Sequence, residues 1–138
     1  MARLVVMFSH SKGCGSYAGP AGVGFILNAA DPQLRVVACP GAPACANAHR
    51  PLREDAARWA ALLPKGEGVV LHVSGCAKGC ARPTATAATF TATAAGYDLI
   101  LAGRAADKPS RRGLSSGGVD EFLACEIGRL LGREGPTA

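Results

Sequence analysis

The sequence contains few aromatic residues and no concentrated run of positive charge. Phe, Tyr and Trp together make up 5% of the 138 residues. The formal net charge is +5, yet no run of Lys or Arg is longer than Arg111-Arg112. Nucleic-acid-binding domains usually combine a dense basic patch with aromatic side chains that stack on bases. The composition therefore argues against a nucleic-acid partner, and it leaves either a solvated basic surface or attraction to an anionic partner.

Long hydrophobic segments are also missing. No apolar stretch reaches the length of a transmembrane helix. The apolar start, residues 1–8, is too short for the hydrophobic region of a signal peptide and runs into polar residues. We therefore expect a cytoplasmic protein with no membrane partner. In that compartment the six cysteines stay reduced and can serve as metal ligands rather than form disulfides.

Four of the cysteines form two pairs in loops that are rich in Gly and Pro. Five residues separate Cys39 from Cys45, and three separate Cys76 from Cys80. Each pair follows a short apolar run that is typical of a β-strand. Four thiolates that converge from two loops suit a tetrahedral metal site or a cubane iron–sulfur cluster.

The spacing of the pairs narrows this choice. Structural zinc sites usually use pairs separated by two to four residues, so the first pair is too wide for the commonest of them. The compact C-x2-C-x2-C run of bacterial ferredoxins is absent. A zinc-stabilised binding domain without redox activity remains an alternative to an iron–sulfur protein.

Both cysteine motifs resemble those of the sulfite and nitrite reductases that contain siroheme and a [4Fe–4S] cluster, and among these the precorrin-3B synthases. The matching segments are ACPGAPAC at 38–45 and HVSGCAKGCARP at 72–83. The form GCAKGC is closer to the precorrin-3B synthases than to the assimilatory reductases, which more often carry GCPNGC. The resemblance extends from about Asp31 to Arg104 and covers the C-terminal siroheme–[4Fe–4S]-binding portion of the family.

The resemblance implies a role for each cysteine of the two pairs. It makes them the ligands of a [4Fe–4S] cluster, and it makes Cys80 the bridge between the cluster and the iron of a siroheme. Lys78 and Arg82 flank this bridging position. One prediction is that they neutralise the charge of the cluster or meet a siroheme carboxylate. The alternative is that they are two exposed cations on a loop. The predicted metal ligands are Cys39, Cys45, Cys76 and Cys80.

The resemblance also implies an oxidoreductase. In the synthase branch the cofactors deliver electrons to activate dioxygen, which hydroxylates precorrin-3A and closes a lactone. In the reductase branch they support the six-electron reduction of sulfite or nitrite. Proteins of the family consist of two related halves, and this chain supplies only the cluster-binding portion of the second. The expected partners are therefore a missing N-terminal half or partner subunit, a tetrapyrrole or small-anion substrate, and an electron donor such as ferredoxin. A stand-alone [4Fe–4S] electron-transfer module is the alternative.

The hydrophobic periodicity predicts an α+β domain with a mixed β-sheet and flanking helices. We expect residues 34–131 to form the cofactor-binding domain, residues 1–33 an N-terminal segment that is the remnant of a preceding domain, and residues 132–138 a flexible tail. The resemblance implies a fold like the [4Fe–4S] domain of nitrite and sulfite reductases. The predicted strands are Arg3–Phe8, Leu34–Ala38, Val69–Val73, Thr84–Thr93 and Tyr97–Ala102, the helices Ala46–Leu63 and Val119–Leu131, and the loop Asp107–Gly118; Gly22–Ala30 is a short helix or strand.

Five further side chains can be placed from their context. Trp59 is expected in the core, and Cys125 is expected to be a small buried hydrophobic residue on the last helix. His72 is expected to be a core histidine with satisfied hydrogen bonds rather than a ligand. Cys14 and His10 are expected to be a free thiol and a surface side chain near the N-terminus.

Overall fold

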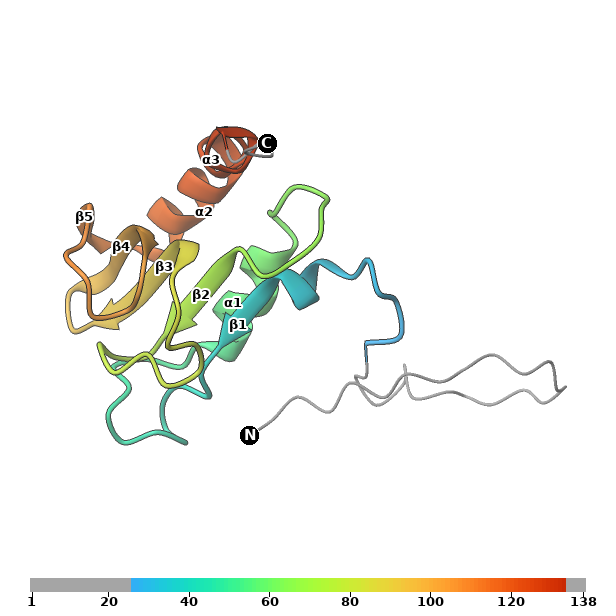
Figure 1. Ribbon diagram of the computed structural model, residues 1–138. Coiled ribbons are helices and arrows are strands. Elements are labelled where there is room, and N and C mark those ends of the chain that lie inside the picture. Colours follow the sequence, from blue (N-terminus) through green and yellow to red (C-terminus); the bar gives the residue numbers. More distant parts are fainter. Residues whose placement is uncertain (1–25, 134–138) are drawn as a thin grey trace, which may run out of the picture.

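The computed structural model describes residues 26–133 (Figure 1). The predictions for Arg3–Phe8, His10 and Cys14 lie outside the described residues. Of the predicted segment Gly22–Ala30, the described residues 26–30 form neither a helix nor a strand. The account below concerns residues 26–133.

A five-stranded sheet forms the centre of the fold. Its strands follow one another in space in the order β1-β2-β3-β4-β5. The first three are mutually parallel, and the last two are antiparallel to their neighbours. The sheet is therefore mixed, as the sequence predicts. The strands are β1 (Val36–Ala38), β2 (Leu71–Ser74), β3 (Thr86–Thr93), β4 (Gly96–Gly103) and β5 (Arg111–Leu114).

The helices pack on one face of this sheet, which we call the helix-covered face. In Figure 1, α1 lies behind β1 and β2, and α2 and α3 lie at the other end of the sheet. Alternate strand residues point toward the helices, because successive side chains of a strand lie on opposite faces. The helical segments are the 3-10 helix η2 (Pro32–Arg35), α1 (Arg53–Ala60), α2 (Ser116–Cys125) and α3 (Ile127–Arg133). The resulting core includes Leu52, Trp59, Leu71, Val73, Phe90, Tyr97, Leu99, Phe122 and Ile127. The α+β class predicted from the sequence is confirmed.

Loops cover the opposite face, which we call the loop-covered face. His72 and Thr89 lie side by side on this face, because they are register partners of β2 and β3. Thr89 Oγ1 donates to the carbonyl oxygen of Gly103 at 2.9 Å, and Thr91 Oγ1 donates to that of Ala105 at 3.1 Å. Residues 103–107 are thereby held over the sheet, where they meet the loop that carries Cys76 and Cys80.

The predicted helix Ala46–Leu63 is too long at its start. The helix begins at Arg53, because the preceding residues bond to other loops: the backbone N–H of His49 donates to the carbonyl oxygen of Gly75 at 3.0 Å. Pro51 also lacks the N–H needed inside a helix.

The C-terminal segment differs from its prediction in two ways. The predicted loop Asp107–Gly118 contains strand β5 and the start of α2. Helix α2 begins early because Ser115 caps it, its hydroxyl accepting a hydrogen bond from the N–H of Gly118 at 3.1 Å. The predicted helix Val119–Leu131 is interrupted at Glu126, which separates α2 from α3.

Two single-residue predictions have opposite outcomes. Trp59 is fully buried, as predicted, and its indole N–H donates to a carboxylate oxygen of Asp120 at 2.7 Å. The prediction that Cys125 is buried is wrong, because the thiol is exposed. Cys125 is the last residue of α2, and the buried Ile127 of α3 supplies the core contact beyond it.

Candidate metal centre

The first cysteine loop leaves the sheet at the end of β1. The N–H of Cys39 donates to the carbonyl oxygen of Val73 at 3.1 Å, which continues the pairing of β1 with β2. Gly41 then turns the chain with φ +74°, and a Cβ atom at this position would lie 2.7 Å from the backbone N of Leu52. Glycine is required here both for its left-handed conformation and for this close approach. The N–H of Cys45 donates to the carbonyl oxygen of Gly41 at 2.9 Å, which closes the loop.

The second cysteine loop leaves the sheet at the end of β2. Ser74 Oγ donates to the carbonyl oxygen of Cys76 at 2.7 Å. Gly79 has φ +60°, a left-handed conformation that favours glycine, and its N–H approaches the same Cys76 oxygen at 3.4 Å. Because β1 and β2 are parallel, both cysteine loops start at the same edge of the sheet, the lower edge in Figure 1.

The two cysteine loops are in direct contact. The N–H of Gly75 donates to Sγ of Cys39 at 3.1 Å. A Cβ atom on Gly75 would lie 2.6 Å from Cβ of Ala48 and 3.1 Å from the Cys39 sulfur, so a larger residue would push the loops apart. A cysteine of the first pair thus lies beside the residue that precedes the second pair.

The structure does not gather the four sulfur atoms around one point. Among the described residues, no three side chains of His, Cys, Asp or Glu are arranged to hold a metal ion. Cys39, Cys45 and Cys76 are partly exposed, and Cys80 is exposed. The ligand set deduced from the sequence therefore stays a prediction, although the loops that carry it are adjacent, as that prediction requires.

The residues present fit a thiolate-bound metal in two respects. The donor set consists of sulfur atoms, which suit zinc and iron–sulfur clusters. The N–H of Gly75 points at the Cys39 sulfur, and such hydrogen bonds stabilise a thiolate and tune a bound cluster.

The polar residues near the second loop differ in their exposure. Lys78 is exposed, so its ammonium group is accessible both to solvent and to a group outside the domain. Arg82 is partly buried, and its Nε atom has no hydrogen-bond partner among residues 26–133. His72 is 0% exposed, as a core residue should be. The prediction that its hydrogen bonds are satisfied is wrong, because neither ring nitrogen has a partner in the described part of the chain.

Burial and a neighbouring charge act together on His72. Burial lowers the pKa of the imidazole from 6.5 to about 4, and the positive charge of Arg82 contributes in the same direction. The ring is therefore neutral at pH 7, with one nitrogen as a donor and the other as an acceptor. Sequence reasoning missed this buried polar pair, although His72 and Arg82 both lie within the segment 72–83 that carries the second motif.

A hollow of about 510 Å³ lies beside the second loop. It is bounded by residues of both cysteine loops, of β3 and β4, and of the segment 105–109; they include His49, Ala77, Thr91, Ile100, Ala105 and Lys108. The cysteine loops thus border a concave surface on the loop-covered side of the sheet. In the described part of the chain, no helix is long and apolar enough to cross a membrane.

These features define an α+β domain with two cysteine-bearing loops in contact at the edge of a mixed sheet. Comparison with known proteins points to the same relationship as the motifs. The chain is 34% identical over 110 residues to a precorrin-3B synthase from Sinorhizobium sp; the match covers 78% of this chain and 24% of that protein. A match of this extent must include both cysteine motifs, because they lie in the middle of the chain.

The similarity confirms the resemblance to precorrin-3B synthase. The chain spans about a quarter of the length of this curated relative. No family model matches the chain. No solved structure matches it either, so the arrangement of strands and helices stands on the structure described above.

Proposed function

We propose that this chain is the iron–sulfur-binding portion of a precorrin-3B synthase-like oxidoreductase in cobalamin biosynthesis. In this proposal Cys39, Cys45, Cys76 and Cys80 hold a [4Fe–4S] cluster, and Cys80 also bridges to the iron of a siroheme. The observation that carries the proposal is the hydrogen bond of 3.1 Å from the N–H of Gly75 to the Cys39 sulfur. This contact joins the two cysteine loops that the sequence assigns to one site.

The chain's own groups have distinct parts in this proposal. The N–H of Gly75 donates to the Cys39 sulfur, and hydrogen bonds of this kind tune the potential of a bound cluster. Gly41 fixes the first loop against the buried Leu52, so that the loop is anchored to the core. Cys80 is exposed, so its sulfur is accessible to a second cofactor outside the domain. When bound, the cluster supplies single electrons at low potential.

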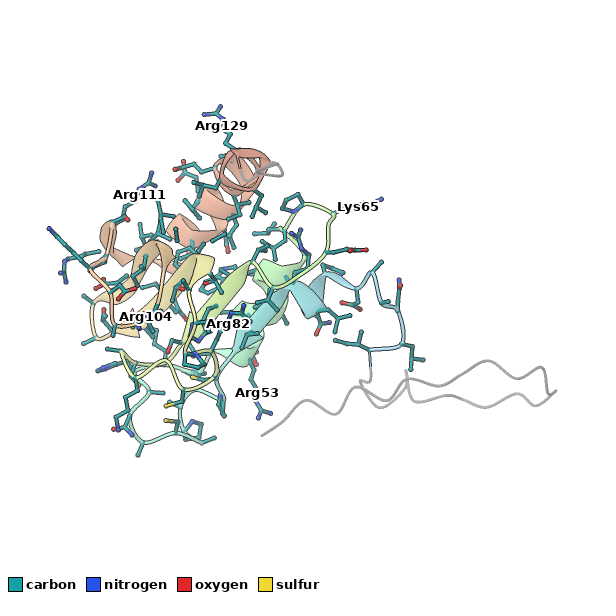
Figure 2. The ribbon with its side chains drawn as sticks, in the orientation of Figure 1. Arg53, Lys65, Arg82, Arg104, Arg111 and Arg129 are labelled. Atoms are coloured by element: carbon teal, nitrogen blue, oxygen red, sulfur yellow. The ribbon has the colours of Figure 1, made fainter. Side chains whose placement is uncertain are left out.

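The proposal includes a partner. Since the chain corresponds to about a quarter of its curated relative, we expect the remaining protein, on the same or another polypeptide, to complete the siroheme and substrate site. The substrate of this assembly would be a precorrin, and its electrons would come from a donor such as a ferredoxin. Exposed arginines distributed around the domain, including Arg53, Arg104 and Arg111, provide positive charge for an acidic donor (Figure 2).

Analysis of metal and sulfide in protein purified without oxygen tests the proposal. We expect iron and acid-labile sulfide in equal amounts, about four of each per chain. The protein should also absorb at about 400 nm, as such clusters do. Cys39→Ser should lose most of the iron, because it removes one ligand. Cys125→Ser is the matched control, since Cys125 is exposed at the end of α2, outside the two loops, and it should retain full iron content.

Three outcomes would contradict the proposal in whole or in part. Stoichiometric zinc and no iron after anaerobic reconstitution would identify a zinc-stabilised domain instead. Equal iron in the Cys39→Ser and Cys125→Ser variants would show that the ligand set is wrong. A cluster without siroheme, even when the rest of the enzyme is supplied, would leave an electron-transfer module.

A further inference from the structure

Beneath the second cysteine loop lie three buried polar atoms without partners. They are Nδ1 and Nε2 of His72 and Nε of Arg82, and none of them has a hydrogen-bond partner among residues 26–133. His72 is 0% exposed. Native proteins leave few buried side-chain nitrogens unpaired, because each one loses its hydrogen bonds to water. Two of the three are N–H donors, one on Arg82 and one on the neutral imidazole, and they set what a bound group has to offer.

The imidazole of His72 and the backbone of Arg82 lie near the same point. A Cβ atom built on Gly79 would be 3.7 Å from Cε1 of His72 and 3.7 Å from the carbonyl oxygen of Arg82, so both residues border the same point under the loop. The charge of Arg82 also acts on the His72 ring. Arg82 is partly buried, and its Nε atom is shielded from solvent.

The positive charge in this place has no partner of opposite sign in the described part of the chain. The ion pairs there are formed by Arg58, Arg104, Arg111 and Arg112, and none includes Arg82. Near Gly79 the structure therefore offers one cation that forms no ion pair among residues 26–133, and one further N–H donor on the neutral imidazole. A partly buried cation with unfilled donors favours an anion over a neutral ligand.

We propose that His72 and Arg82 form a binding site for a small oxyanion or a carboxylate group beneath the Cys76–Cys80 loop. Two acceptor oxygens of such a group match the N–H of Arg82 Nε and the N–H of the His72 imidazole. The full burial of His72 limits the bound group to a few atoms. A free anion and a carboxylate of a tetrapyrrole present the same chemistry. The tetrapyrrole case rests on the proposed function and gives Arg82 the role that the resemblance implies, whereas the free-anion case needs neither cluster nor siroheme.

Nitrogen NMR of the full chain labelled with 15N-histidine tests this proposal. The sequence contains three histidines, His10, His49 and His72, so three pairs of imidazole nitrogen signals are expected. Formate and sulfate serve as probes, and a sodium chloride series at matched ionic strength controls for screening. We expect the probes to shift the His72 nitrogens along a saturable curve. His72→Gln assigns the signal; if that variant does not fold, His10→Gln and His49→Gln assign it by elimination.

The variant Arg82→Gln separates an anion site from a merely structural histidine. It should weaken anion binding by about tenfold or more, because it removes the charge and the Nε donor. Arg104→Gln is the matched control, since Arg104 is an exposed arginine paired with Asp107, and it should leave the binding curve unchanged. Amide spectra of both variants establish that they remain folded.

Several results would overturn the proposal. Shifts no larger than those in chloride would mean that water satisfies the three nitrogens. Equal binding by wild type and Arg82→Gln would remove Arg82 from the site. Two other results would support the site. Competition by uroporphyrin, a porphyrin that carries carboxylates, would identify a tetrapyrrole carboxylate as the natural group. Formate binding without such competition would identify a free anion. Because the measurement is made without a cluster, its failure is distinct from a failure of the iron analysis.

Discussion

The two faces of the sheet are built on different principles. The helix-covered face is apolar and its polar atoms are paired. Trp59 lies 4.9 Å from Tyr97 and 5.5 Å from Phe90, measured between ring centroids, and Phe90 lies 5.8 Å from Phe122. The two polar atoms of these rings are satisfied: the indole N–H bonds to Asp120, and the Tyr97 hydroxyl donates to Asp55 at 2.5 Å.

The loop-covered face is polar and incompletely paired. The hydroxyls of Thr89 and Thr91 are used to hold residues 103–107, but His72 and Arg82 have nitrogens without partners in residues 26–133. The same face carries the cysteine loops and the hollow beside them. The helix-covered face thus holds the paired core of the domain, and the loop-covered face carries the unpaired nitrogens and the hollow, where we propose that ligands bind. The following predictions test this division.

The largest effect is expected in the aromatic cluster. Phe90→Ala should lower the free energy of unfolding by about 3–5 kcal/mol, because it removes a fully buried ring that contacts both Trp59 and Phe122. Urea denaturation followed by circular dichroism measures the change. Leu101→Ala is the control, because Leu101 lies on the adjacent strand but is exposed. Similar losses in both variants would contradict the assignment of the core.

A pH effect is expected on the loop-covered face. The pKa of His72 is lowered to about 4 in the folded protein, whereas the imidazole has its ordinary pKa of about 6.5 in the unfolded chain. As the pH falls below about 6.5, the unfolded chain therefore binds a proton before the folded protein does. The free energy of unfolding should therefore decrease between pH 7 and pH 4, by up to about 3 kcal/mol from this residue. Buffers without carboxylates or oxyanions are needed, because a bound anion would favour the charged ring.

Replacement of His72 checks the origin of this loss. His72→Gln should flatten the decrease below pH 6.5, whereas His49→Gln should not, because His49 is exposed. An identical pH dependence in both variants would show that other groups cause the loss, and the loop-covered face would then contribute nothing to acid sensitivity.

A smaller effect is expected from the hydroxyl group of Tyr97. Burial, followed by the hydrogen bond to Asp55, raises the pKa of Tyr97 well above its ordinary value. Tyr97→Phe should cost about 2 kcal/mol, because the lost bond has a charged acceptor. The contribution is complete below pH 10 and is lost at higher pH, where the unfolded chain ionises first. The difference between the two proteins should thus shrink above pH 10 in urea titrations.

The smallest effect is expected from an ion pair at the surface. Arg111 forms two hydrogen bonds with Glu126, at 2.9 and 2.7 Å, but both side chains are more than a third exposed. Arg111→Gln should reduce the free energy of unfolding by less than about 1 kcal/mol, and added salt should reduce the difference further. A loss as large as that in Phe90→Ala would mean that the contact between β5 and the junction of α2 and α3 matters as much to the fold as the aromatic cluster does.

Local patterns in the sequence predict the centre of the sheet well. Thr and Ala alternate before the Ala95-Gly96 turn, and the structure pairs Thr93 with Gly96 at this hairpin. The cysteine loops follow β1 and β2, as the apolar runs before them indicate. Periodicity succeeds here because burial on a sheet depends on spacing along the chain.

Long-range pairing was beyond the reach of the sequence. Strand β5 is polar, and it becomes a strand because it pairs with β4; the N–H of Gly113 also donates to a carboxylate oxygen of Asp98 at 2.9 Å. The hydrophobic pattern indicates only that His72 is buried. It does not show that its ring nitrogens have no hydrogen-bond partner among residues 26–133. The final positions of the four thiols depend on loop conformation, which spacing alone does not determine.

The chain contains a single tryptophan, and Trp59 is packed entirely among residues of the helix-covered face. Its emission is therefore a local optical signal from that side of the sheet. Quenchers dissolved in the solvent should scarcely reach it while the aromatic cluster is intact. Changes in fluorescence would report loosening of the structural half of the domain, and events confined to the other half would leave the spectrum unaltered.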